Sequence, residues 1–506
     1  MRIDNSLKNM IIAVISNLLT IIIGIVSRAF FIKFLGNEYL GINSLFSNII
    51  SMLAIAELGI GSTIIFYLYK PLAEDDLDTI KSLMRFYKKS YQLIGTIILI
   101  VGLMVFPFLK YVVDFDAFVV PINLLLVYLL FLIDAVLSYF LSYKRSILYA
   151  DQKNYVIVAI HLIYTILLNL VQLVIMFATQ NYYLYLLIKL VFRIIENLLI
   201  NYYVDKKYNY LSSYANKLDK KIESEIFKKV KALILHKIGG FIVLGTDNII
   251  ISKYLGIVVV GLYSNYCLII DSVYSLFNQA LTSITASVGN LLVSEKGDKQ
   301  FYIFKKIRFM NFWIATFSGV CIYIIINSFV TIWIGKRYLL NQFVVFVLVL
   351  NLYQKLMRCT YMNFKEAAGI CLEDRFVPII ESVLNILFSI VLVKTLGLAG
   401  VFIGTFISSF ALWCYSFPKF VYKKLFNRSY FDYGIETFGY LILFISVLLV
   451  TSYCANIFVL NDIYLDFIKN VILSVVLPNV VLVVVFRKDE NFQYFIQLIK
   501  EKILKR

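Results

Sequence analysis

Long apolar runs alternate with short polar segments along the whole chain, and the polar segments are rich in Lys and Arg. A helix needs about 20 apolar residues to cross the hydrocarbon core of a bilayer. About fourteen runs reach that length, so the pattern predicts an all-α polytopic membrane protein with about 14 transmembrane helices. The predicted spans are 10–34, 42–69, 91–113, 118–140, 155–178, 181–203, 232–256, 261–293, 309–334, 341–363, 377–396, 398–418, 437–458 and 466–486.

Composition agrees with that class, and the placement of charge orients the chain. Of the 506 residues, 61% are hydrophobic and 16% are charged, which excludes an ordinary soluble globular protein. The net charge of +17 comes from Lys and Arg that concentrate in alternate connections, as the positive-inside rule requires. An even number of spans then places both termini in the cytoplasm, and no nucleic-acid partner is expected.

A short motif occurs twice, 220 residues apart: Lys33–Gly41 reads KFLGNEYLG, and Lys253–Gly261 reads KYLGIVVVG. Each copy lies between the first two spans of a six-span half, so we expect two lobes related by a pseudo-two-fold axis along the membrane normal. The alternative that this is a common turn signal stays open, because a related L-G-x-x-G occurs at Leu396–Gly400. The predicted divisions are an N-terminal six-helix lobe (1–203), a cytoplasmic amphipathic linker (204–231), a C-terminal six-helix lobe (232–418), a loop with two extra transmembrane helices (419–486) and a cytoplasmic basic tail (487–506).

Three features of the sequence resemble one family. The first span ends in R-x-F-x-x-x-x-L-G (Arg28–Gly36), the second span carries Glu57–Gly59 followed by Gly61, and a second Leu-Gly hairpin opens the second half. With six, six and two spans, the chain resembles the O-antigen and capsule repeat-unit flippases. These form the polysaccharide-transporter branch of the multidrug/oligosaccharidyl-lipid/polysaccharide exporter superfamily.

The resemblance implies a V-shaped pair of six-helix lobes that works by alternating access. The implied cargo is an undecaprenyl-pyrophosphate-linked oligosaccharide, moved from the inner to the outer leaflet of the bacterial plasma membrane for capsule or O-antigen export. Membrane lipids, a polysaccharide polymerase and chain-length machinery are the implied partners. By analogy with lipid II flippases, the two extra helices would line a groove for the lipid tail.

The sixth predicted span carries the most informative charges. Lys189, Arg193 and Glu196 are spaced by four and three residues, so they share one helical face within an apolar segment. Ionisable groups at membrane depth usually face a protein or water-filled interior. Guanidinium binds phosphate oxygens in a bidentate fork, so Arg193 is the first candidate to bind pyrophosphate, and Lys189 adds a point charge. A structural Arg193–Glu196 pair, with Lys189 snorkelling outward, stays open as the alternative.

Arg28 is the second pyrophosphate candidate. It lies about 9 Å from the outer end of its predicted helix, so snorkelling to that surface is the alternative. The resemblance favours binding, because the first span of this family often supplies a cavity cation. The 220-residue offset places Asn248 opposite Arg28, so the second half lacks this cation.

Acidic side chains inside the spans are candidates for cavity groups or for binding a coupling ion. Glu57 or Asp134 could pair with the cavity arginines or bind a coupling Na⁺ or H⁺, and structural pairing is the favoured interpretation for both. His161 is expected to be a hydrogen-bonded packing residue. No other cofactor and no metal site is expected. The acidic candidates are Glu57, Asp134, Glu196, Asp247 and Asp271.

Two other functions stay open. A multidrug or cation exporter of the same fold is one, although such proteins usually have twelve spans and acidic cavities. A membrane glycan polymerase or glycosyltransferase is the other, because Asp114-Phe115-Asp116 matches a D-x-D metal-binding pattern. All predicted outer connections are short, however, and no P-loop motif is present. A secondary transporter, rather than an enzyme, is therefore expected.

Overall fold

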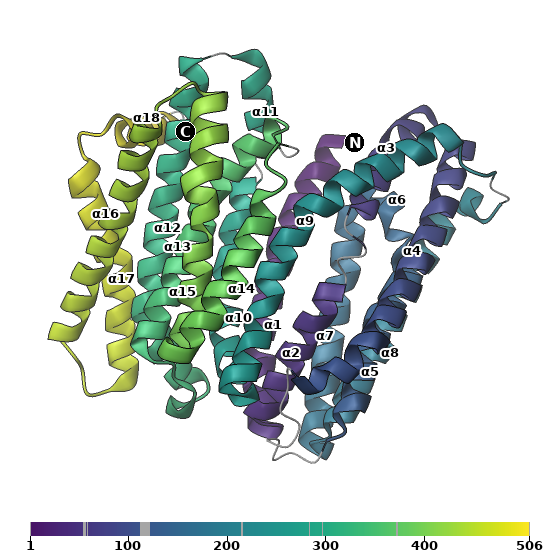
Figure 1. The fold of residues 1–506 in the computed structure, drawn as a ribbon, viewed down its shortest axis with the longest axis horizontal. Helices are drawn as coiled ribbons and strands as arrows, with labels where there is room; N and C mark the ends of the chain where they lie inside the picture. The colour runs from purple at the N-terminus through teal and green to yellow at the C-terminus, as the bar shows by residue number, and fades with distance from the viewer. Residues whose placement is uncertain are drawn as a thin grey trace. The chain divides into compact units, whose positions relative to one another are not determined.

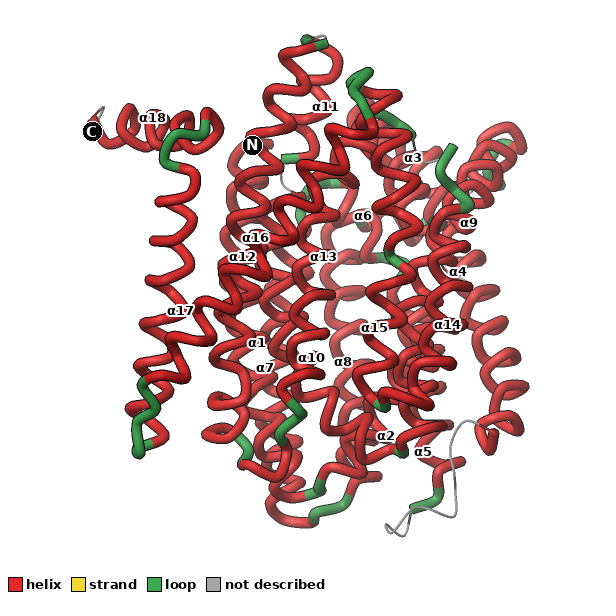
Figure 2. Tube along the Cα trace, turned by 60° about the vertical axis from the view of Figure 1, so that its left-hand side comes forward, coloured by secondary structure: helices red, strands yellow, loops and turns green. Residues whose placement is uncertain are grey.

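The computed structural model of the protein describes residues 2–53, 57, 59–111, 122–213, 216–282, 284–295, 297–370 and 373–504. Across these ranges every regular element is a helix (Figures 1 and 2). Eleven helical segments within them are long and apolar enough to cross a membrane. The prediction of an all-helical polytopic membrane protein is therefore confirmed, and the count of 14 spans stays a prediction.

The three remaining predicted spans correspond to helices that are broken or charged. The segment 42–69 overlaps two helices, α2 (Asn37–Leu53) and α3 (Ile60–Glu74), and Gly59 precedes α3 with φ 95°, so its assignment as one span stays a prediction. The segment 181–203 lies in α8 (Tyr182–Lys207), which carries several charged side chains in its middle. The segment 232–256 is the later part of a longer helix, α9 (Lys220–Leu255).

The predicted amphipathic linker (204–231) stays a prediction, and its later residues lie in α9. This helix runs unbroken from Lys220 to Leu255, so its first turns include the second half of 204–231, which is not a helix of its own. Its start packs on α3 and α4. The Tyr67 hydroxyl donates to Glu225 Oε2 at 3.1 Å, and the Lys229 ammonium lies 3.8 Å from the ring centroid of Phe66. Aromatic and ionic contacts therefore attach α9 to the preceding helices.

The chain divides into two compact units, Met1–Ser264 and Asn265–Arg506. Within the first unit α1 packs against α7, and α5 packs against both α4 and α8. The predicted lobe boundaries stay predictions. The other helices of the first unit are α1 (Arg2–Phe34), α4 (Leu77–Val105), α5 (Leu124–Ser142), α6 (Arg145–Ala150) and α7 (Asn154–Thr179), and α10 (Ile257–Thr282) begins in it.

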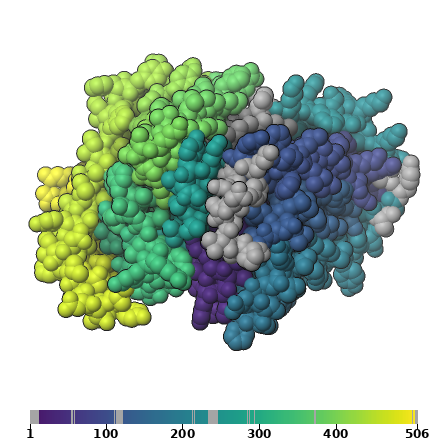
Figure 3. All heavy atoms as spheres, turned by 60° about the horizontal axis from the view of Figure 1, so that its bottom comes forward, coloured from purple at the N-terminus to yellow at the C-terminus, as the bar shows by residue number. Residues whose placement is uncertain are grey.

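The second unit is built around α12 (Asp298–Trp333), which packs against α13, α16 and α17. In Figure 3, α16 and α17 form an edge of this unit in yellow. The C-terminal helix lies crosswise to α17 in Figure 2, and its Phe492 ring stacks on Trp313 with centroids 5.5 Å apart. The other helices are α11 (Thr285–Ser294), α13 (Gln342–Ala367), α14 (Val377–Leu396), α15 (Leu398–Ser408), the π-helix η6 (Ala411–Leu425), α16 (Tyr430–Ile457), α17 (Ile463–Phe486) and α18 (Glu490–Leu504).

The repeated motif forms a reciprocal contact within the first unit. A Cβ atom at Gly41 would lie 2.2 Å from the carbonyl oxygen of Ile257, and a Cβ atom at Gly261 would lie 2.5 Å from that of Asn37. Asn37 and Ile257 are themselves 220 residues apart. This exchange of partners is the pattern that a two-fold repeat produces. Glycine is required at both positions because the two backbones touch.

Gly41→Ala is expected to lower stability, because the added methyl group meets backbone that cannot rotate away. Overpacking of this kind costs roughly 1–3 kcal/mol. Thermal unfolding in detergent micelles should show a lower midpoint for Gly41→Ala. Gly439→Ala is the matched control, because a Cβ atom at Gly439 meets no heavy atom within 4 Å. Equal midpoints for the two variants would contradict the contact.

Candidate functional site

A cavity of about 600 Å³ lies within the first unit, bounded by α2, α3, α4, α5, α6 and α8. Its charged lining residues include Glu57, Asp134, Arg145, Lys189 and Arg193. A pocket with a few charged groups among hydroxyls is a usual form of ligand site. The hydroxyl-bearing residues of the lining are Ser47, Ser51, Ser62, Ser138, Ser142, Ser146, Tyr87, Tyr91, Tyr139 and Tyr149.

Asparagine caps set where the two main charged helices begin. Asn181 Oδ1 accepts hydrogen bonds from the backbone N–H groups of Tyr183 and Leu184 at 2.9 and 3.2 Å, and it starts α8. Asn123 Oδ1 accepts one from Leu126 N at 3.1 Å and starts α5. An N-cap satisfies N–H groups that the first turn leaves without a partner. The helical register of α5 and α8 then brings their charged side chains together.

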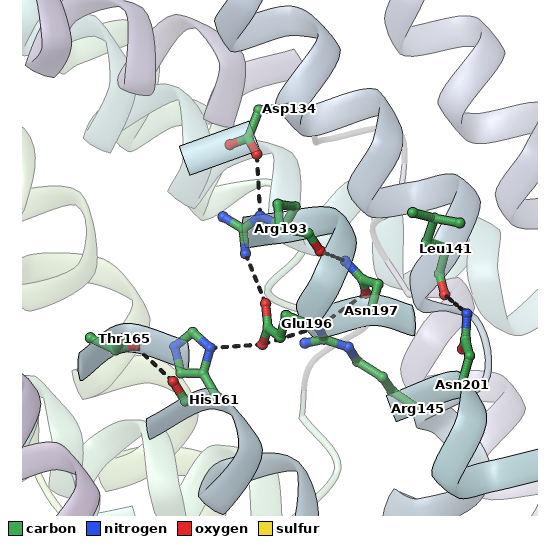
Figure 4. A network of polar contacts seen from close by, with 9 residues as sticks. All are labelled: Asp134, Leu141, Arg145, His161, Thr165, Arg193, Glu196, Asn197 and Asn201. Atoms are coloured by element: carbon green, nitrogen blue, oxygen red, sulfur yellow. Dashed lines mark hydrogen bonds and ion pairs between the residues drawn. The ribbon is translucent and has the colours of Figure 1, made fainter. Parts of the chain in front are cut away.

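Asp134 on α5 joins the two cations of α8. Arg193 Nε lies 3.3 Å from Asp134 Oδ1, and Lys189 Nζ lies 3.5 Å from Asp134 Oδ2. Figure 4 shows Arg193 between Asp134 and Glu196, and its Nη1 is 3.6 Å from Glu196 Oε2. The structure therefore contains the Arg193–Glu196 pair, and it places Lys189 beside a carboxylate.

Glu196 connects this group to two further helices. Its Oε1 lies 3.2 Å from Arg145 Nη2 of α6 and 2.9 Å from His161 Nδ1 of α7. Glu196 is only 1% exposed. A buried carboxylate is costly without cationic or hydrogen-bonding partners. Here it has three, which come from α6, α7 and its own helix.

The network holds more cations than carboxylates. Lys189, Arg193 and Arg145 face Asp134 and Glu196, which leaves one positive charge in excess before His161 is counted. The ion-pair distances of Lys189 and Arg193, from 3.3 to 3.6 Å, exceed the ~2.7–2.9 Å of close charge-assisted hydrogen bonds. Both cations also line the cavity. An anion that enters the cavity can therefore bind them without breaking short hydrogen bonds.

Glu57 lies apart from the cations. Its Oε1 accepts a hydrogen bond from the Tyr91 hydroxyl, and the rings of Tyr87 and Tyr91 pack with centroids 4.3 Å apart. No Lys, Arg or His nitrogen in the described part of the chain lies within 4 Å of the Glu57 carboxylate. Of the two acids that sequence offered as partners for the arginines, Asp134 has that role and Glu57 does not.

Three other predicted site residues do not line the cavity. Arg28 Nη1 donates to Ser264 Oγ at 2.9 Å, which connects α1 to the start of α10. Asp247 is partly buried on α9. Asp271 belongs to the second unit, where it lies 3.6 Å from Lys355 Nζ. The structure therefore brings together five of the eight predicted residues in one cavity and its wall.

Sequence analysis missed one member of the network. Arg145 lies in a predicted cytoplasmic connection, where it reads as a topology signal, but α6 brings it to Glu196. His161 was expected to be a hydrogen-bonded packing residue, and it contacts Glu196. No local signal identified Arg145, because its contact depends on the packing of separate helices.

The second unit contains buried charges that sequence analysis also missed. Arg308 is 2% exposed, and its Nη2 lies 2.5 Å from Glu436 Oε2, which also accepts a hydrogen bond from the Tyr422 hydroxyl at 2.6 Å. Lys365 and Asp374 form a second buried pair, and Ser416 Oγ donates to Asp374 Oδ2 at 2.6 Å. These groups connect α12, α13, η6 and α16.

Within the described ranges no group of three or more His, Cys, Asp or Glu side chains is placed to hold a metal ion. The D-x-D sequence at Asp114 and Asp116 lies outside the described residues.

The described chain thus combines long apolar helices with a charged internal cavity in the first unit. The structure is similar to the lipid II flippase MurJ in an inward closed conformation, with a TM-score of 0.66 and 14% identity over 94% of this chain and 99% of that chain. The chain therefore has the fold of the MOP-type transporters, of which MurJ and the MATE proteins are solved examples.

Two MATE structures are also similar. An inward-facing multidrug resistance transporter of the MATE family gives a TM-score of 0.58 and 16% identity, over 78% of this chain and 94% of that one. A mutant of the Vibrio cholerae MATE transporter VcmN gives 0.55 and 12%, over 82% and 96%. No family model and no curated protein matches the sequence. These likenesses are of fold, and the substrate is not resolved by them.

Glu196→Ala is expected to lower the free energy of unfolding by about 3–5 kcal/mol, because it removes the buried carboxylate that Arg145, His161 and Arg193 share. Unfolding in a mild detergent by increasing denaturant should measure the loss. Glu74→Ala is the control: Glu74 pairs with Lys70 at 3.9 Å in a largely exposed pair, which contributes less than about 1 kcal/mol. A Glu196 variant as stable as the control would show that the network adds nothing to the fold.

Proposed function

We propose that the protein is a flippase for undecaprenyl-pyrophosphate-linked oligosaccharides. It moves repeat units from the inner to the outer leaflet of the bacterial plasma membrane by alternating access, for capsule or O-antigen export. The observation that supports this most is the pair Lys189 and Arg193, which lines a hydroxyl-rich cavity while loosely held by Asp134 and Glu196. Anionic cargo with a polar head suits this arrangement.

The chemistry of a diphosphate matches the two cations. The guanidinium of Arg193 can hold two phosphate oxygens in a fork, and the ammonium of Lys189 adds a mobile point charge. When the cargo binds, its phosphate oxygens replace part of the ion pairing that Asp134 provides to Lys189 and Arg193. When it leaves, Asp134 pairs again with both cations and Glu196 with Arg193, so neither cation is left without a carboxylate partner.

The structural similarities support a lipid-linked cargo over a drug. The MurJ structure, described as a lipid II flippase, aligns with 94% of this chain, whereas the two MATE structures align with 78% and 82%. The two helices α16 and α17 expose many apolar side chains. In this proposal they contact the polyprenyl tail, which is too long to be enclosed by the cavity.

An exporter of cationic drugs is the second candidate, because it would use the same fold. Glu57 among tyrosines favours it, since aromatic rings and a carboxylate together attract organic cations. The charge of the rest of the cavity opposes it. Apart from Glu57, the lining holds three cations, Arg145, Lys189 and Arg193, and one carboxylate, Asp134, so this part of the cavity would repel a cationic cargo.

The direct test is to find which leaflet holds the lipid-linked oligosaccharide. The gene is deleted in its host, and an impermeant sugar-oxidising reagent is applied to intact protoplasts and to opened membranes. Accumulation on the inner leaflet that the wild type reverses would support the flippase. Normal appearance on the outer leaflet with failed polymerisation would favour a polymerase, and unaltered lipid intermediates would favour an exporter.

Arg193→Gln is expected to lower the flipping rate by about 10- to 100-fold, because it removes a charge-assisted contact of about 1.5–3 kcal/mol. Arg193→Lys keeps the charge without the fork and should be intermediate. The same leaflet assay measures both variants at matched expression. Lys70→Gln, which changes an exposed cation outside the cavity, should flip at the wild-type rate. A wild-type rate for Arg193→Gln would remove Arg193 from the binding site.

Arg28 is proposed as a second cation for the cargo at another stage of transport. If it binds phosphate, Arg28→Lys should retain more activity than Arg28→Ala in the leaflet assay, because the lysine keeps the charge. Equal and small effects would leave Arg28 as an anchor between α1 and Ser264. A Ser264→Ala variant separates these outcomes, because it removes the hydrogen bond from Arg28 to Ser264 and keeps the charge of Arg28.

A further inference from the structure

One part of the cavity has a chemistry that the pyrophosphate does not require. Glu57, Tyr87 and Tyr91 come from the turn before α3 and from α4, and all three line the cavity. Tyr87 and Tyr91 are 4% and 5% exposed, so their rings form a rigid wall. Tyr139 of α5 extends this wall, with its ring centroid 5.8 Å from that of Tyr91.

The polar groups of this wall converge on one point. A Cβ atom at Gly61 would lie 3.2 Å from the Tyr87 hydroxyl, 3.3 Å from the Tyr91 hydroxyl and 3.6 Å from Glu57 Oε1. Gly61 also lines the cavity, and a side chain at this position would crowd both hydroxyls. Two hydroxyls and a carboxylate oxygen therefore meet over the bare backbone of Gly61.

This set of groups suits a ligand that both donates and accepts hydrogen bonds. A phenol can do both, whereas an ionised carboxylate only accepts. The rings add flat apolar surface next to these polar atoms. A pyranose combines the same features, because its hydroxyls donate and accept while its C–H faces are apolar. The serines of the cavity extend the hydrogen-bonding capacity around it.

We infer that Glu57, Tyr87, Tyr91 and the bare backbone at Gly61 form a saccharide subsite. It holds the sugar that follows the diphosphate, while Lys189 and Arg193 hold the diphosphate. The inference rests on the proposed function, since it divides one cargo between two parts of one cavity. The hydroxyl-rich wall then selects the sugar. The two cations bind the diphosphate, which every lipid of this class carries.

The subsite is tested by comparing two ligands on one protein. The full-length protein is placed in lipid nanodiscs, and dissociation constants are measured for farnesyl diphosphate and for farnesyl diphosphate linked to a hexose or to an N-acetylhexosamine. At least one sugar-bearing lipid should bind about tenfold more tightly than the bare diphosphate, as expected for one hydrogen bond to a charged group.

Two variants remove the polar groups of the subsite. Glu57→Gln and Tyr91→Phe keep the size of each side chain, and each should abolish the sugar-dependent gain while the dissociation constant of farnesyl diphosphate stays within about twofold of wild type. Gly61→Ala retains every polar group but adds a methyl group that crowds the Tyr87 and Tyr91 hydroxyls, and it should have the same effect. Tyr128→Phe is the matched control: its hydroxyl donates to Gly102 O at 2.8 Å outside the cavity lining, so the gain should persist.

The outcomes separate this inference from the proposed function. If farnesyl diphosphate binds but no sugar in the panel adds affinity, the saccharide subsite is wrong and the flippase proposal stands. A gain that survives in all three subsite variants also overturns the subsite. If neither lipid binds the wild type, the proposed function fails and the inference fails with it. Ethidium binding that depends on Glu57, with no gain from sugar, would assign this wall to a cationic drug.

Discussion

An ionised side chain inside a helical bundle must have a partner, and in the first unit this requirement joins four helices. Glu196 of α8 contacts Arg145 of α6 and His161 of α7, while Arg193 reaches Asp134 of α5. The cost of leaving any of these groups unpaired in a medium of low dielectric constant exceeds most single packing contacts. The charged network therefore sets the relative positions of the helices that surround the cavity.

The second unit meets the same requirement in a different way. Arg308 and Lys365 are almost fully buried with Glu436 and Asp374, and Tyr422 and Ser416 supply further hydrogen bonds. Short contacts and complete burial are typical of groups that hold helices together. In the first unit the pairs of Lys189 and Arg193 are longer and face a cavity. The same type of ion pair thus stabilises the fold in one unit and leaves cations accessible in the other.

Several features of the site were within reach of the sequence. The four-and-three spacing on α8 predicted that Lys189, Arg193 and Glu196 would act together, and the 220-residue repeat identified glycines that the structure brings into reciprocal contact. Other features were not. The segment 42–69 reads as one apolar run although it overlaps two helices, α2 and α3, and Arg145 reads as a topology signal although it contacts the buried Glu196. Gly61 gave no sign that two tyrosines would converge on it.

The sequence by itself determined the class of the protein, most of its helices and the face of α8 that carries charge. These depend on the number and spacing of apolar residues within a single helix, which local sequence specifies directly. Only the tertiary structure decided which acid pairs with which cation, and that Glu57 lies with Tyr87 and Tyr91 rather than with an arginine. Such pairings join residues that are far apart in the chain, so they follow from how the helices pack, and no periodicity within one helix records them.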